Sequence, residues 1–155
     1  MTTGSAGTAA GGTAAGGPAT GGVRGLALIV QSGGYDRVHY ALVLAAGAAA
    51  IGRPAILFFT GRALRALLPD GWRTLDAADD GTGPAERDAV LAARGVADFE
   101  TLLAACRDLD VRMIACEMGL RAEGLEGAAL RPDLTVERAG VVTLLTEAGG
   151  AVVAL

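Results

Sequence analysis

Short runs of consecutive apolar residues recur along the chain and are separated by longer stretches of mixed polarity. These runs are Leu26–Val30, Ala55–Phe59, Val111–Ala115 and Ala151–Leu155. An apolar run of about five residues without regular alternation is typical of a strand buried on both faces. We therefore expect four buried strands, and a further short strand over residues 134–136.

The segments between these strands have helical patterning. The first is apolar on nearly all sides from Val38 to Ile51, with Asp36 as its candidate N-cap, and Gly52 and Pro54 follow its end. Further helices are expected over residues 61–68, 84–94, 98–109, 117–122 and 137–148, with a polar surface loop over residues 70–83. Helices of this length between buried strands are expected to pack on the faces of a sheet.

Strands that alternate with helices pair in parallel through right-handed crossovers. The sequence therefore predicts an α/β domain over residues 23–155, with three α/β/α layers and an open, mainly parallel sheet of about five strands. In its last helix, Val141, Leu144, Leu145 and Ala148 share one stripe and are expected to face the core.

The first 22 residues are almost entirely Gly, Ala and Thr. Such a segment has no large side chains to bury, so residues 1–22 are expected to form a disordered tail. The tail lacks the basic start and the aliphatic centre of a secretory signal. The longest apolar run, Ala41–Ile51, is shorter than the roughly 20 residues that a membrane-spanning helix needs. We expect a cytoplasmic protein with no membrane partner.

Charge and composition exclude further classes of function. The formal net charge is −4 and no run of basic residues occurs, so no nucleic-acid partner is expected. The chain has two cysteines, Cys106 and Cys116, and one histidine, His39. This set is too small for a disulfide scaffold or a structural zinc site. We expect no metal and no cofactor.

Cys116 is the sharpest candidate for chemistry, because it falls where the third predicted strand ends. In open parallel sheets, functional groups gather outside the carboxyl ends of the strands. Backbone N–H groups at the start of a following helix favour the reactive thiolate, whereas the neighbouring Glu117 opposes it by charge. The alternative is a small buried side chain, which is the commonest role of a free cysteine.

Cys106 lies on the apolar stripe of the preceding helix and is expected to be structural. Measured from the turn that joins helix and strand, Cys106 lies about 4 to 5 Å back and Cys116 about 16 Å forward. This mismatch of roughly 10 Å exceeds the ~7 Å limit between bridged Cα atoms. No disulfide between the two cysteines is expected.

The loop after the first strand supplies the remaining candidate residues, which are Gly33, Gly34, Tyr35, Asp36 and His39. Its backbone N–H groups are a candidate anion site, but the spacing of a dinucleotide-binding or Walker-type loop is missing. The histidine either supplies a base to the cysteine, if the two loops are neighbours, or holds a loop carbonyl. Together with Glu117 and Met118 beside the cysteine, these residues form the predicted pocket lining.

The residues also resemble a known family, the DsrE/DsrF-like family, which includes sulfur-relay proteins. The most specific stretch is Val111–Leu120 (VRMIACEMGL), followed by Gly124 and Leu125. The opening strand and helix that end in Gly-Arg-Pro, the segment Phe58–Gly61 and the segment Ala139–Val142 extend the likeness over residues 24–155. The Cys-Glu-Met-Gly form is similar to the uncharacterised branch of the family.

The resemblance implies a parallel sheet of about five strands and assembly into trimers or hexamers. It also implies that Cys116 accepts a sulfane sulfur as a persulfide and hands it to a partner thiol. Three hypotheses follow. The first is a sulfur-relay or persulfide-carrying protein with a donor or acceptor protein as partner. The second is a small-ligand or anion-binding module, and the third is an oligomeric interaction protein without catalysis.

Overall fold

The computed structural model describes residues 1–3 and 22–155 of the chain. Nearly all of the predicted disordered tail therefore lies outside the described residues. The described part contains a five-stranded sheet in the order β4-β3-β2-β1-β5, and every neighbouring pair is parallel. Its strands are β1 (Gly25–Val30), β2 (Ala55–Phe59), β3 (Arg112–Cys116), β4 (Val136–Ala139) and β5 (Gly150–Ala154). The predicted α/β class and parallel sheet are confirmed.

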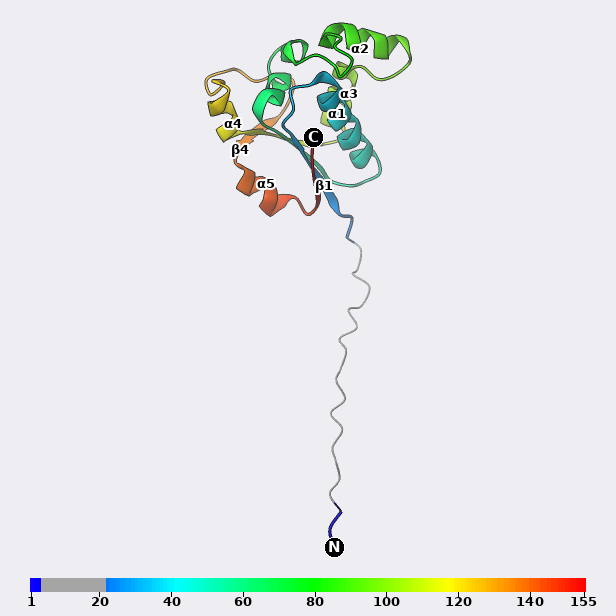
Figure 1. The fold of residues 1–155 in the computed structure, drawn as a ribbon, viewed down its shortest axis with the longest axis vertical. Helices are drawn as coiled ribbons and strands as arrows, with labels where there is room; N and C mark the ends of the chain where they lie inside the picture. The colour runs from blue at the N-terminus through cyan, green and yellow to red at the C-terminus, as the bar shows by residue number, and fades with distance from the viewer. Residues whose placement is uncertain (4–21) are drawn as a thin grey trace.

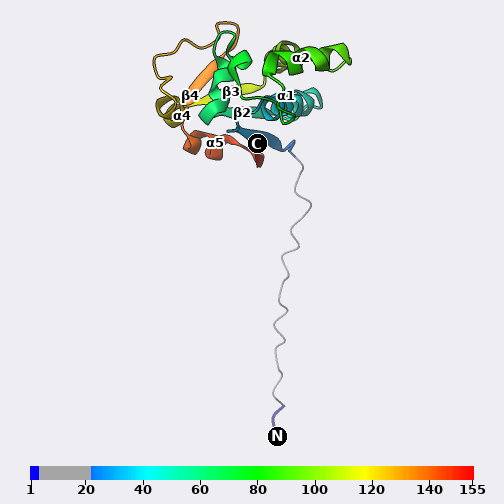
Figure 2. The ribbon, with the colours of Figure 1, turned by 45° about the horizontal axis from the view of Figure 1, so that its top comes forward.

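Helices cover the two faces of this sheet unequally, which makes the three predicted layers (Figure 1). They are α1 (Tyr35–Ala50), η1 (Gly61–Leu67), η2 (Gly71–Thr74), α2 (Pro84–Ala93), α3 (Phe99–Asp108), α4 (Glu117–Ala122) and α5 (Val141–Glu147). Buried residues of α1, η1, η2, α3 and α4 share one apolar cluster, which we call the first face. Among the described helices, α5 alone contributes to the opposite cluster, the second face, and it lies below the strands in Figure 2. No helix among the described residues is long and apolar enough to cross a bilayer.

Alternation along each strand divides the core between the two faces. In β2, Leu57 and Phe59 point into the first face, whereas Ile56 and Phe58 point into the second. In β3, Cys116 lies on the second face. The first face holds most of the large buried side chains, so we expect it to supply most of the stability of the fold.

Two boundaries on the first face differ from the predicted ones. Helix α1 begins at Tyr35 with Gly34 as its N-cap, so Asp36 lies inside the first turn instead of capping it. Residues 70–83 are not simply a surface loop, because Trp72 in η2 is only 2% exposed and stacks on Phe99. The predicted cap of α3 is confirmed, since the Asp98 side chain accepts a hydrogen bond from the amide of Thr101.

The C-terminal elements depart further from the prediction. The fourth strand occupies residues 136–139 instead of 134–136, and α5 begins only at Val141. Within α5, Leu144 is buried, but Val141 and Leu145 are 43% and 60% exposed instead of facing the core. Strand β5 is not a buried strand either, because it is the edge strand and all its residues are exposed. The apolar pattern identifies the strand but carries no information on its position in the sheet.

Candidate functional site

Cys116 is the last residue of β3 and the N-cap of α4. Its Sγ accepts a hydrogen bond from the backbone N–H of Gly119, over an N···S distance of 3.3 Å. The side chain is 3% exposed and belongs to the second-face cluster, together with Ile114 and Phe58. The sulfur therefore lies at the carboxyl end of the sheet, as predicted, but beneath a covering layer.

The close approach of α4 to the sheet explains why this turn is tight. A Cβ atom on Gly119 would lie 2.6 Å from Oγ1 of Thr60 and 3.1 Å from a methyl carbon of Leu64. Glycine therefore lets the first turn of α4 pack against the segment that follows β2. Because the Gly119 amide is fixed by this packing, the hydrogen bond to the Cys116 sulfur has a fixed direction.

Glu117 and Met118 occupy the first turn of α4 and point into solvent. Met118 is 71% exposed. A polar hollow of about 270 Å³ lies beside the helix and is lined by Glu117, Leu120, Arg121, Glu126 and Arg138. Glu117 and Met118 follow Cys116 directly in the chain, but their side chains are exposed whereas the Cys116 sulfur is buried.

The loop after β1 is occupied by another part of the chain. The amide of Tyr35 donates to the carbonyl of Asp76, and the amide of Asp76 donates to the carbonyl of Gly33. The amide of Gly34 donates to Oγ of Ser32. A Cβ atom on Gly33 would lie 2.6 Å from an oxygen of the Asp76 carboxylate. The amides of Gly34 and Tyr35, two of the N–H groups of this candidate anion site, are therefore already hydrogen-bonded within the chain.

Asp36 has a similar internal role. Its carboxylate accepts a hydrogen bond from the amide of Asp79 and forms an ion pair with Arg87 of α2. This contact ties the polar loop and the start of α2 to the first turn of α1. Asp76 is likewise paired, with Arg62 and Arg65, so the carboxylates at this end of α1 have cationic partners within the chain.

Tyr35 and His39 belong to the first-face side of the molecule, not to the cysteine. The Tyr35 hydroxyl donates to the Asp88 carboxylate, and burial together with that carboxylate raises the pKa of the tyrosine. Nε2 of His39 lies 2.8 Å from the carbonyl oxygen of Ala97. The histidine therefore has the loop-holding role, and the alternative in which it serves Cys116 as a base is wrong.

Strand order explains why the two predicted loops do not meet. In the sheet, β2 separates β1 from β3, so the segment after β2 lies between the two loops. Hypothetical Cβ atoms on Gly33 and on Gly119 would contact Arg62 and Thr60 of this segment, respectively. The candidate residues therefore form two separate groups, one in the loop after β1 and one at the start of α4.

Cys106 has the structural role that the sequence predicts. Burial raises the pKa of its thiol to about 11, and its Sγ lies 3.6 Å from the carbonyl oxygen of Leu42. The side chain belongs to the first-face cluster. Both cysteines are free thiols, as expected. Each face of the sheet thus carries one of the two cysteines.

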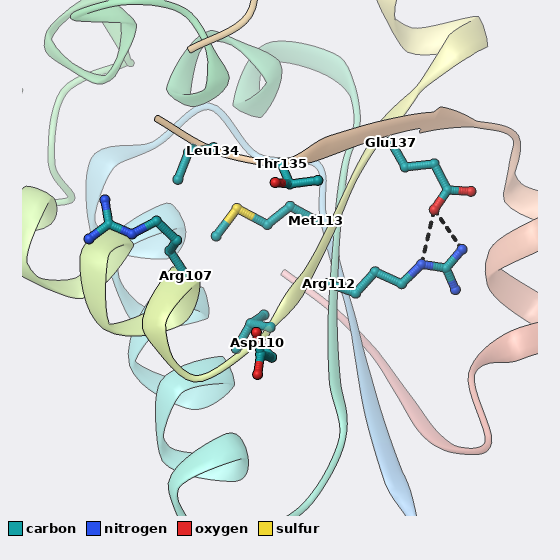
Figure 3. Close-up of a pocket in the computed structure, with 8 residues that line it drawn as sticks. Arg107, Asp110, Arg112, Met113, Leu134, Thr135 and Glu137 are labelled. Atoms are coloured by element: carbon teal, nitrogen blue, oxygen red, sulfur yellow. Dashed lines mark hydrogen bonds and ion pairs between the residues drawn. The ribbon is translucent and has the colours of Figure 1, made fainter. Parts of the chain in front are cut away.

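Two features of the structure could not be predicted from the sequence. The first is the buried side of Asp88, which accepts hydrogen bonds from the Tyr35 hydroxyl and from the amide of Phe99. The second is a hollow of about 320 Å³ at the amino end of β3, shown in Figure 3. Its lining includes Met113, Leu134, Thr135 and Arg107, which come from segments that the sequence places far apart. No local motif could have identified either feature, because both depend on long-range packing.

Comparison with known proteins gives a fold and no sequence family. No family model matches the chain, and no curated protein matches it by sequence. Among solved structures, the crystal structure of the ychN protein from E. coli is similar, with a TM-score of 0.52 and 16% sequence identity. The match covers 84% of this chain and 99% of that chain. The chain therefore shares the fold of that protein.

Proposed function

We propose that the chain is a persulfide carrier in a sulfur relay, with Cys116 as the sulfur acceptor. The observation that supports this role is a single thiol at the carboxyl end of β3, held by the amide of Gly119 in the fold shared with the ychN protein. The likeness of the sequence around Cys116 to the sulfur-relay family also supports sulfur transfer through a persulfide as its chemistry. Its partners are a donor and an acceptor thiol, and the reducing cytoplasm is the compartment in which such thiols persist.

The exchange needs little beyond the thiol itself. The Cys116 thiolate attacks the outer sulfur of a donor persulfide, R–S–SH, and forms a new S–S bond. The S–S bond of the donor breaks, and R–S⁻ leaves and takes up the proton released by Cys116. The products are Cys116–S–SH and R–SH, so atoms balance and no external oxidant is consumed. A second exchange of the same kind passes the outer sulfur to an acceptor thiol.

Mass spectrometry of the intact protein tests this function, with glutathione persulfide as the donor. We expect the wild-type chain and Cys106→Ala to gain about 32 Da, the mass of one sulfur atom, and dithiothreitol to remove it. Cys116→Ser should gain nothing. Cys106 is a built-in control, because its raised thiol pKa and its burial keep it unreactive. An adduct that persists in Cys116→Ser, or a wild-type chain that gains mass only when denatured, would contradict the proposal.

A second candidate function, assembly with copies of itself, is supported by the edge of the sheet. Within the described residues β5 pairs only with β1, and it carries apolar side chains on both faces. Val152 and Val153 are 42% and 39% exposed. An exposed apolar edge strand is a ready surface for pairing with another strand, and a second copy of this chain presents the same edge.

Light scattering at micromolar concentration tests this assembly. An edge that pairs with the same edge of a second copy joins copies two by two, so we expect the wild-type chain to form an even-numbered assembly such as a hexamer. The assembly should be smaller when Val152 and Val153 are both replaced by lysine. Val96→Lys is the matched control, because Val96 is an exposed valine (43%) outside the sheet and should leave the mass unchanged. A monomeric wild-type chain would remove this function.

A further inference from the structure

The burial of Cys116 conflicts with the chemistry proposed for it. Sulfur exchange proceeds through in-line attack on a second sulfur, so the attacking thiolate needs an open approach. In the folded chain the Cys116 side chain is 3% exposed. The thiol can therefore exchange sulfur only when some part of its cover moves away.

The second-face cluster shows which helix packs on the same face of the sheet as the sulfur. Cys116 is paired in register with Ala139 of β4, and α5 begins two residues after Ala139. Leu144 of α5 is fully buried in the same cluster as Cys116 and Ala139. Among the described helices α5 is the one that lies on this face.

Helix α5 is held to the sheet by few interactions. It has seven residues, and Leu144 is the one buried residue within it, whereas α1 buries seven. Its N-cap is Gly140, which has no side chain with which to cap the helix. At its other end, Glu147 accepts a hydrogen bond from Arg112 of β3, and both side chains are more than a third exposed.

Glycines flank the helix on both sides. Gly140 precedes it, and Gly149 follows it with a positive φ of 59°. Beyond Gly149, β5 is hydrogen-bonded to β1 and remains fixed when α5 moves. Small residues at both ends of a short helix allow it to move as a unit while the strands on either side stay paired.

From this arrangement we propose that α5 is a lid over Cys116, which opens by local unfolding and so controls when the thiol reacts. The inference rests on the proposed function of Cys116 and adds its regulation. Opening exposes Leu144 and the second face but leaves the larger first-face cluster intact. It therefore costs less free energy than global unfolding.

The two cysteines report separately on local and global opening, because Cys106 lies in the first-face cluster. Slow alkylation of the native protein by iodoacetamide can be followed at both thiols in tryptic peptides 95–107 and 113–121. We expect Cys116 to be modified at least about tenfold faster than Cys106. Low concentrations of urea should raise the alkylation rate of Cys106 steeply and that of Cys116 only weakly, because lid opening exposes much less surface than unfolding.

Two substitutions then identify the moving element. Leu103→Ala weakens the first-face cluster, so it should accelerate alkylation of Cys106 by tenfold or more, on the order of the cost of a core truncation, and leave Cys116 unchanged. Leu144→Ala removes the buried side chain that holds α5 to the sheet, so it should raise the alkylation rate of Cys116 about tenfold or more. If either variant fails to fold, milder substitutions serve instead: Val38→Ala elsewhere in the first-face cluster, and Leu144→Val in α5.

The lid is refuted if the alkylation rate of Cys116 rises in parallel with that of Cys106, both in urea and in Leu103→Ala. Global unfolding would then be what exposes both thiols. An unchanged Cys116 rate in Leu144→Ala refutes it as well, because another element would then control access. Iodoacetamide requires no sulfur donor. The lid can thus fail while the persulfide adduct forms, and the adduct can be absent while the lid opens.

Discussion

Replacing Gly150 by alanine is expected to lower the free energy of unfolding by about 3 kcal/mol, through a clash that the backbone cannot relieve. A Cβ atom at this position would lie 2.1 Å from the carbonyl oxygen of Gly25 and 2.8 Å from its nitrogen. Gly25 and Gly150 are partners in the register between β1 and β5. The two glycines therefore allow the strands to start side by side, and a methyl group forces them apart.

The matched control is the same substitution in a position with free space. Gly47 lies within α1, and a Cβ atom there would meet nothing within 4 Å. Alanine is the better helix former, so Gly47→Ala should raise the free energy of unfolding by about 0.5 to 1 kcal/mol. Urea titrations of both variants measure the two effects. Equal effects of the two substitutions would contradict the assigned register of β5.

The strand pattern predicted the fold class because burial on both faces leaves a clear signal in the sequence. The runs in β1, β2 and β3 are apolar at almost every position, and these strands lie inside the sheet. The run in β5 has the same composition but lies at the edge. Strand order depends on where the crossovers go, which local composition does not record. The predicted burial of β5 failed for this reason.

The candidate site could be predicted only in part. Cys116 was identified because a strand end is a local feature, and the structure places it there. The choice between the two roles left open for His39 needed the strand order, because β2 lies between the two strands whose loops would have had to meet. The contact between Tyr35 and Asp88 joins residues 53 positions apart. Such pairings follow from tertiary packing, and no spacing rule along the chain would have found them.

The orientation of α5 shows the same limit for helices. Its apolar stripe correctly predicted that Leu144 faces the core, but the sequence gives no measure of how wide a surface the helix covers. A narrow contact leaves Val141 and Leu145 exposed although they lie on the predicted stripe. This narrow contact is the feature on which the proposed lid depends.

The second large effect is expected at Arg131, which fixes the segment that leads into β4. Its side chain is only 10% exposed and donates to the carboxylates of Glu100 and Asp133 over distances of 2.7 to 2.9 Å. Glu100 also accepts a hydrogen bond from the indole N–H of Trp72. Replacing Arg131 by methionine leaves both carboxylates without their cation. Because both carboxylates are more than 40% exposed and water can solvate them, we expect the free energy of unfolding to fall by only about 1 to 2 kcal/mol at pH 7.

The contribution of these ion pairs to the free energy of unfolding is expected to decrease at low pH. The Arg131 guanidinium lowers the pKa of Glu100 and of Asp133 in the folded chain. A carboxyl group with a depressed folded pKa stabilises the fold above its unfolded pKa of about 4, and that contribution is lost as the pH falls through the folded value. The difference between wild type and Arg131→Met should therefore be full at pH 7 and 5 and much smaller at pH 3.

Urea titrations at these three pH values measure the difference directly. Arg121→Met is the control, because Arg121 and its ion-pair partner Glu126 are both exposed, so this substitution should leave the free energy of unfolding nearly unchanged. A difference that stays constant from pH 7 to pH 3 would show that Arg131 stabilises the chain by packing of its stem instead of by its charge. Ala139, which ends β4, is the register partner of Cys116. The same ion pairs therefore hold the segment that precedes the strand next to Cys116.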